Sequence, residues 1–200
     1  EVSADEVAGS NSQQITYTYD DSTLLKMTVG SNALIFSYGI DGQPLSVNYN
    51  GTDYYYVTNA FGDVVGIANS SGTEVVTYTN DAWGNILSTS GTMASTLGTH
   101  NPFRYRSYVY DQETGLYYLR SRYYNSAICR FINSDVYMST GQGILGHNMF
   151  AYCLNNPVLS IDTSGAVATR IDLTDQDKDG DGIPDEPGGV SSGGQSTSSN

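Results

Sequence analysis

Apolar and polar residues alternate along short runs in the first half of the chain, with the period of two that is typical of half-buried β-strands. The clearest runs are residues 15–20, 34–38, 54–57 and 75–78. Turn-forming residues follow them, such as Asp41-Gly42, and dipeptides of this kind often connect the strands of a hairpin. The pattern therefore predicts an all-β fold whose antiparallel sheet runs from about residue 15 to 125.

Tyrosine recurs at a near-constant distance within this region. Tyr19, Tyr38, Tyr56 and Tyr78 are separated by 19, 18 and 22 residues. A strand–turn–strand unit of about 20 residues is typical of repeat proteins, and adjacent units must pair because one hairpin alone is marginally stable. The alternative is an ordinary antiparallel sheet in which the tyrosine spacing arises by chance.

Two matching runs rich in Tyr and Arg, residues 102–110 and 116–124, flank a turn at residues 111–115. Gly115 suits a left-handed turn position, so we expect a hairpin over residues 102–124, the best-ordered part of the sheet. Arg and Tyr on facing strands can form cation–π contacts, and we interpret these arginines as structural. The alternative is a nucleic-acid platform of Arg and aromatic side chains.

The overall charge argues against that alternative. The net charge is −13, and only 14% of the residues are charged. Binding to nucleic acids or anionic membranes needs clustered cations, so we expect no nucleic-acid partner. No run of 18 apolar residues is present, so we expect no membrane insertion either. Cys129 and Cys153 are too few for a disulfide framework or a zinc site, and the sequence leaves one disulfide or two free thiols as alternatives.

An acidic segment near the end of the chain has the spacing of a calcium-binding loop. Carboxylates stand at positions 1, 3 and 5 of residues 175–186, a glycine at position 6 and a glutamate at position 12. The candidate ligands are Asp175, Asp177, Asp179, Asp181, Asp185 and Glu186. We expect weak Ca²⁺ binding, with a dissociation constant on the order of 10⁻⁴–10⁻³ M as in extracellular modules. A solvated acidic linker is the alternative.

Several longer stretches carry a resemblance to a known family. Residues 101–165 include NPFRYRSYVYDQETGLYYLRSRYYN, CRFINSD, GHNMFAYCLNNPV and DTSG. They resemble the RHS-repeat-associated core, and residues 15–87 resemble the YD repeats that precede such a core. The acidic segment is similar to thrombospondin type-3 calcium repeats.

The resemblance implies a β-sheet strip, part of a spiral shell, in which the core caps one end of the shell. It divides the chain into a disordered edge (1–14), YD-repeat sheet (15–100), RHS-associated core (101–166), calcium-loop-like segment (167–186) and flexible Gly/Ser tail (187–200). The four units present are too few to close a container, so we expect the chain to be the C-terminal part of a longer protein.

The same resemblance implies a structural or interaction module, secreted or on the surface of a bacterium, that encloses or presents a C-terminal effector. The expected partners are the rest of the repeat shell and that effector, often a toxin. A cell-surface protein or glycan that contacts exposed tyrosines is a further candidate.

The resemblance also implies an alternative, a self-cleaving aspartyl protease. Its candidate catalytic pair is Asp135 and Asp162, with Arg130 in support, and two such carboxylates can share one proton and activate water. The family's Asp-Pro motifs are replaced by Asp135-Val136 and Asp162-Thr163, and Ala166 occupies the usual hydrophobic cut position. We therefore expect slow cutting or none, and both aspartates could instead stabilise turns.

Overall fold

The computed structural model describes residues 14–135 and 148–170. In this part the chain forms antiparallel sheets joined by turns and a few short helical segments, which confirms the all-β prediction. The predicted disordered edge at 1–14 lies almost wholly outside the described residues, as do most of the calcium-loop-like segment and all of the Gly/Ser tail.

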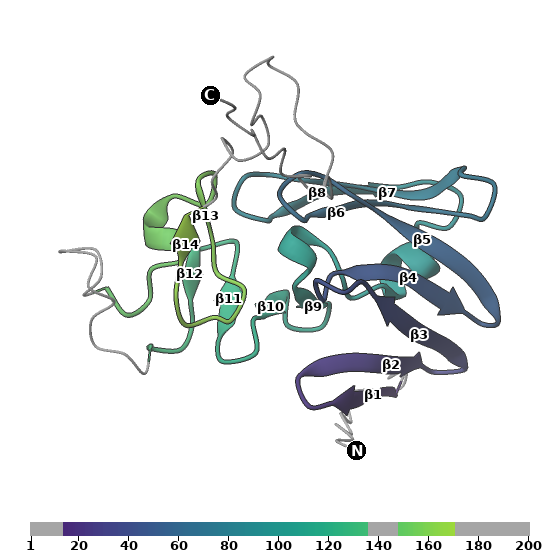
Figure 1. The fold of residues 1–200 in the computed structure, drawn as a ribbon, viewed down its shortest axis with the longest axis horizontal. Helices are drawn as coiled ribbons and strands as arrows, with labels where there is room; N and C mark the ends of the chain where they lie inside the picture. The colour runs from purple at the N-terminus through teal and green to yellow at the C-terminus, as the bar shows by residue number, and fades with distance from the viewer. Residues whose placement is uncertain (1–13, 136–147, 171–200) are drawn as a thin grey trace, which may run out of the picture.

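The largest sheet, which we call the strip, contains eight strands paired in the order in which they occur along the chain. They are β1 (Ile15–Asp20), β2 (Thr23–Val29), β3 (Asn32–Tyr38), β4 (Pro44–Tyr49), β5 (Thr52–Thr58), β6 (Val64–Ala68), β7 (Glu74–Asn80) and β8 (Ile86–Ser90). Each strand pairs with the next through a short connection. The strip curves so that one face is concave (Figure 1).

The four tyrosines predicted to mark the repeats lie on alternate strands, β1, β3, β5 and β7. The repeating unit is therefore a pair of strands, and the alternation of side chains places each marker in or against one apolar core on the concave face. That core includes Leu34, Val47, Ile67 and Val76, all fully buried.

The five-residue connection between β7 and β8 is closed by its own polar side chain, Asp81. The carboxylate Oδ1 of Asp81 accepts a hydrogen bond from the backbone N–H of Trp83 and another from the residue two further on, each at 2.9 Å. Gly84 follows with φ +87°, and a Cβ there would lie 2.6 Å from the ring of Tyr105. The turn that begins at Asn59 is built in the same way.

After β8 the chain turns back and crosses the concave face of the strip. We call residues 91–108 the plug; they contain α1 (Leu97–His100) and the 3-10 turn η2 (Tyr105–Ser107). Figure 1 shows the strip curving around this segment. The predicted hairpin is wrong in its first arm, because Arg106 and Ser107 adopt left-handed backbone angles that end any strand there.

A second sheet follows, so the predicted single sheet to residue 125 is also wrong. Its strands are β9 (Val109–Asp111), β10 (Leu116–Tyr118), β11 (Tyr123–Asn125) and β12 (Arg130–Phe131), in the spatial order β12-β11-β10-β9. The turn at residues 111–115 is where the sequence predicted it. The 3-10 turn η4 (Cys153–Asn155) and a hairpin of β13 (Ser160–Ile161) and β14 (Thr169–Arg170) complete the described part.

The second sheet and the plug residues Tyr105 and Tyr108 form a second aromatic core, and tyrosine hydroxyls attach this core to the strip. The hydroxyls of Tyr105, Tyr117 and Tyr124 donate to backbone carbonyls of residues 82–84, at 3.0, 2.8 and 2.7 Å respectively. These phenols are buried, and each satisfies its polar group on the β7–β8 turn. No helix in residues 14–135 and 148–170 is long and apolar enough to cross a membrane.

Candidate active site

The two candidate catalytic aspartates meet at one buried arginine that the sequence analysis did not select. Arg122 Nη1 lies 3.1 Å from Asp135 Oδ2, and Arg122 Nη2 lies 3.3 Å from Asp162 Oδ2. All three side chains are at least nine-tenths buried. The guanidinium also packs over the ring of Phe131, with 3.6 Å from its central carbon to the ring centroid. We call these three charged residues the Arg122 cluster.

Burial and the neighbouring cation have opposite effects on the pKa of Asp162. Burial, the largest cause, raises the pKa of this carboxyl above its ordinary value, while Arg122 and the backbone N–H groups of residues 164–166 lower it. Burial likewise lowers the pKa of Arg122, against the opposing effect of the two aspartates. An arginine stays charged even so, and the cluster therefore contains one permanent cation.

The Arg122 cluster is hydrogen-bonded to both ends of the Gly165–Ala166 peptide bond. The Nε–H of Arg122 donates to the carbonyl oxygen of Gly165, and the N–H of Ala166 donates to Asp162 Oδ1 at 3.1 Å. This bond adjoins Ala166, near which the family resemblance implies a cut. A guanidinium on the carbonyl and a carboxyl beside the amide nitrogen are groups that could stabilise charge and transfer a proton during hydrolysis.

Local backbone geometry fixes this loop tightly. Gly165 has φ +70°, and a Cβ there would lie 2.6 Å from the carbonyl oxygen of Leu119. Ser121 Oγ donates to Ser164 O at 2.8 Å, and the hydroxyl of Tyr108 donates to Asp162 O at 2.7 Å. The loop is therefore bound to β10 and its neighbouring residues at several points.

Arg130, the predicted supporting residue, lies elsewhere. It is exposed in β12, pairs with Asn125 across the sheet, and makes no ion pair with either aspartate in the part of the chain that the structure describes. Arg122 is the arginine that contacts both aspartates. The only sequence signal for Arg122 was its position in the Tyr- and Arg-rich run. There the alternation of side chains cannot tell a buried arginine from an exposed one.

The other predicted site residues divide into described and undescribed ones. The six candidate calcium ligands, Asp175, Asp177, Asp179, Asp181, Asp185 and Glu186, lie outside the described residues, and Ca²⁺ binding stays a prediction. Within residues 14–135 and 148–170, no group of three or more His, Cys, Asp or Glu is placed to hold a metal ion. Cys129 and Cys153 are free thiols, and burial raises the pKa of Cys153 to about 12.

The contact between the plug and the strip is the largest functional feature that sequence reasoning missed. Phe103 is 3% exposed and makes edge-to-face contacts with the rings of Phe36, Tyr38 and Tyr56, at 5.0, 6.0 and 6.0 Å between centroids. Asn101 accepts a hydrogen bond from the Tyr56 hydroxyl at 2.8 Å. The plug thus contacts the tyrosine markers of two successive repeats.

Further hydrogen bonds join the plug to inner strands of the strip. The Tyr78 hydroxyl donates to Gly98 O at 2.8 Å, and the Tyr49 hydroxyl lies 3.0 Å from His100 Nδ1. The backbone also contributes, since the N–H of Val64 donates to Arg104 O at 2.9 Å. The plug is therefore bound to strands from β4 to β7 by polar groups that its own burial would otherwise leave unpaired.

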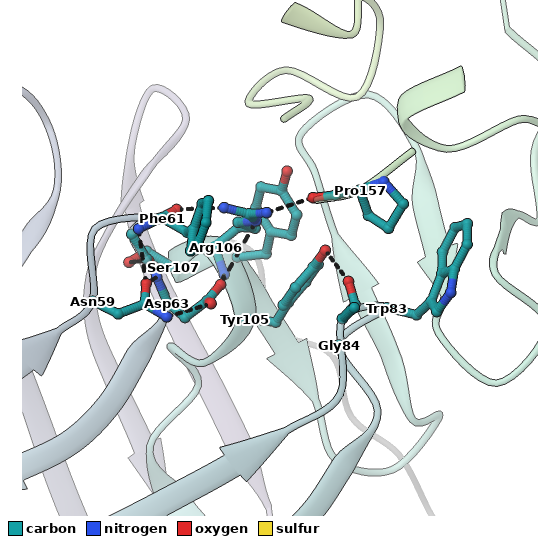
Figure 2. Close-up of polar contacts among 12 residues, drawn as sticks. Asn59, Phe61, Asp63, Trp83, Gly84, Tyr105, Arg106, Ser107 and Pro157 are labelled. Atoms are coloured by element: carbon teal, nitrogen blue, oxygen red, sulfur yellow. Dashed lines mark hydrogen bonds and ion pairs between the residues drawn. The ribbon is translucent and has the colours of Figure 1, made fainter. Parts of the chain in front are cut away.

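Arg106 joins the three parts of the molecule, as Figure 2 shows. Its guanidinium donates to Phe61 O at 2.9 Å in the β5–β6 turn and to Pro157 O at 2.6 Å in the segment before β13. Its backbone N–H donates to Asp63 Oδ1 at 2.8 Å, and its guanidinium lies over the Phe61 ring at 4.8 Å. Through these contacts Arg106 has the structural role that the sequence analysis predicted for the arginines of this region.

A family profile and related bacterial proteins match this chain. A family profile described as Teneurin YD-shell matches residues 10–158. The tRNA3(Ser)-specific nuclease WapA of Bacillus spizizenii is 40% identical over 159 residues, which is 78% of this chain and 7% of that protein. Toxin protein Tse5 of Pseudomonas aeruginosa is 38% identical over 66 residues, 33% of this chain and 5% of Tse5.

Solved structures share the fold at lower identity. The TcdB2-TccC3 complex matches with a TM-score of 0.61 and 22% identity, over 80% of this chain and 8% of that one. The Tc holotoxin pore of Photorhabdus luminescens matches with a TM-score of 0.54 and 18% identity, over 84% of this chain and 9% of that one. The profile match over residues 10–158 shows that this chain belongs to the Teneurin YD-shell family, and its fold is similar to that of the TcdB2-TccC3 complex.

Proposed function

We propose that this chain is the terminal cap of a YD-repeat shell, secreted or on the surface of a bacterium, that encloses or presents a C-terminal effector. The observation that supports it is the plug. Residues 91–108 leave β8, cross the concave face and bind tyrosines of the repeats, so the chain covers the inside of the strip instead of adding another strand. Two relatives named for a nuclease and a toxin are consistent with an effector in the same polypeptide.

The test needs a complete shell, because the chain spans 7% of the WapA relatives that it matches. We would replace the matching 159 residues of WapA from Bacillus subtilis with this chain. A specific protease site would be inserted after residue 170 of this chain. Enclosure predicts that this site resists the protease in the native chimera and is cut when Phe103→Ala loosens the plug.

The control is the same protease site placed in the β4–β5 turn at Asn50-Gly51, which is exposed and should be cut in both versions. Equal cutting at both positions in the native chimera would show that the C-terminal segment is presented outside the shell. A cap that fails to form would instead leave the chimera insoluble, because terminal units of repeat proteins cover the exposed core.

Self-cleavage is the second candidate function, and the contacts at the Gly165–Ala166 bond favour it. Asp135 would take a proton from a water molecule as the water attacks the Gly165 carbonyl carbon, and Arg122 would stabilise the developing oxyanion. The C–N bond would then break, and the Ala166 nitrogen would leave with a proton from Asp162. Against this, Arg122 gives the two carboxylates a shared cation, whereas the aspartic-protease mechanism needs them to share a proton.

We expect the intact mass of the 200-residue chain to persist during incubation at about pH 5–7, because Arg122 pairs with both carboxylates in place of a shared proton. Mass spectrometry over several days is the measurement. A fragment that ends near residue 166, absent from the Asp135→Asn variant but present in Arg130→Met, would establish the protease and identify Asp135 as part of it.

We also propose that residues 175–186 bind one Ca²⁺ ion through the carboxylates named above. The spacing of the six residues supports this.

A further inference from the structure

The outer face of the second sheet is exposed over its last two strands. Tyr124 and Phe131 belong to the second aromatic core, so the alternation of side chains places Tyr123, Arg130 and Ile132 on the opposite face. Tyr123 is 40% exposed and Ile132 is 46% exposed, and Arg130 is exposed as well. The backbone N–H of Ile132 donates to Tyr123 O at 2.9 Å, so these two residues are neighbours across the sheet. We call Tyr123, Arg130 and Ile132 the outer patch.

The positive charge at the outer patch is not neutralised by any described carboxylate. Arg130 makes no ion pair within residues 14–135 and 148–170. The same holds for Arg120, which is exposed in the turn that leads into Tyr123. Two exposed guanidinium groups beside two partly exposed apolar side chains match a segment that carries both carboxylates and aliphatic side chains.

A segment of this composition follows the second sheet in the same chain. Residues 171–186, which lie outside the described part, contain seven carboxylates and one lysine, a net charge of −6. Ile171 and Leu173 stand among the first of these carboxylates. The charge and the apolar residues of this segment therefore both complement the outer patch.

The path of the chain brings the start of this segment close to the outer patch. Gly165 O accepts a hydrogen bond from Nε of Arg122, the residue before Tyr123. β14 ends at Arg170, five residues after Gly165, and an extended chain of that length spans at most about 18 Å. The β13–β14 hairpin packs against the second aromatic core beside β12 (Figure 1). The outer patch lies on two neighbouring strands, about 5 Å apart, so residues 171–186 can reach all of it.

We propose that residues 171–186 dock on the outer patch. Their carboxylates lie near Arg120 and Arg130, and the side chain of Leu173 contacts Tyr123 and Ile132. Each exposed ion pair contributes little on its own. A tethered segment, however, has an effective concentration in the millimolar range, so weak contacts are enough to populate the docked state. Docking depends neither on Ca²⁺ nor on self-cleavage.

The first test compares amide chemical shifts of the full 200-residue chain with those of a neutralised variant, in EDTA so that Ca²⁺ does not occupy the carboxylates. The variant carries Asp172→Asn, Asp175→Asn, Asp177→Asn and Asp179→Asn. We expect the amides of residues 123–125 and 130–132 to differ between the two chains at about 20 mM salt and to coincide at about 0.5 M, where charges are screened within a few ångströms. Asp53→Asn with Glu74→Gln is the matched control, because it removes exposed carboxylates from the strip and should leave these amides unchanged.

The second test changes the patch instead of the segment. Arg130→Gln should reduce docking about 2- to 5-fold, the contribution of one exposed ion pair. The measurement is the heteronuclear NOE of the amides of residues 171–186, which rises with the docked fraction. Lys26→Gln is the matched control, since Lys26 is an exposed cation on β2, and it should leave the NOE unchanged.

The proposal is overturned if neutralising the segment leaves the amides of residues 123–125 and 130–132 unchanged, or if the difference is as large at about 0.5 M salt as at about 20 mM. Equal NOE values in Arg130→Gln and Lys26→Gln would also overturn it. A hexaglutamate peptide that shifts these amides where neutralisation does not would overturn it as well, and would make the outer patch a site for an acidic partner from another molecule.

Discussion

Phe103→Ala should destabilise the protein by ~3–5 kcal/mol, the typical cost of removing a buried phenylalanine ring. The ring packs edge-to-face against three aromatic side chains of the strip. We expect the plug to detach while the hairpins of the strip persist. Chemical denaturation measures the free energy, and hydrogen exchange at residues 98–104 measures the release.

Phe150→Ala is the matched control for this variant, because Phe150 is 41% exposed and its backbone carbonyl, not its ring, pairs with Phe131. Its effect should be below about 1 kcal/mol. Equal losses in the two variants, or an unchanged exchange rate at residues 98–104 in Phe103→Ala, would show that the plug is not held by this ring.

Arg122→Met should cost a similar amount, ~3–5 kcal/mol at pH 7, because it leaves two buried carboxylates without their cation. Adding Asp162→Asn should restore part of the loss, since it removes one of the uncompensated charges. Arg130→Met is the control and should change stability by less than about 0.5 kcal/mol, because Arg130 is exposed.

The stability that Arg122→Met loses should depend on pH, in a direction set by Asp162. Burial raises the pKa of Asp162 in the folded state above its ordinary value of 3.8, so the folded chain binds this proton more tightly than the unfolded chain. Stability from this group therefore falls as pH rises from about 3.8 through the folded pKa. Without Arg122 the folded pKa rises further, and the deficit of Arg122→Met should shrink between pH 7 and pH 4.5. A constant deficit across that range would contradict the charge explanation.

The repeats could be predicted because their signal is local. Period-two alternation and the Tyr19, Tyr38, Tyr56 and Tyr78 spacing depend only on neighbouring residues, and the structure places all four on alternate strands of one sheet. The turn at residues 111–115 was found for the same reason. Contacts between consecutive hairpins need no information from distant parts of the chain.

The plug could not be predicted because it contradicts its own local pattern. Residues 102–108 alternate like a strand, yet Arg106 and Ser107 take left-handed backbone angles that only their tertiary partners stabilise. The same limit applies to the candidate site. The resemblance supplied Asp135 and Asp162, but the choice of Arg122 over Arg130 depends on burial, which the sequence does not contain.

The plug binds segments that precede it in the sequence, and this affects the order in which the chain can fold during synthesis. Phe103, Asn101 and Arg106 bind residues of the strip, and the loop at Asp162–Ala166 binds residues 108–122, so most of these contacts join a later segment to one already made. The strands pair with their immediate neighbours, and such local pairing folds fast. A ribosome-bound chain can therefore complete each hairpin in order, and the cap docks last, after every strand that it must cover has emerged.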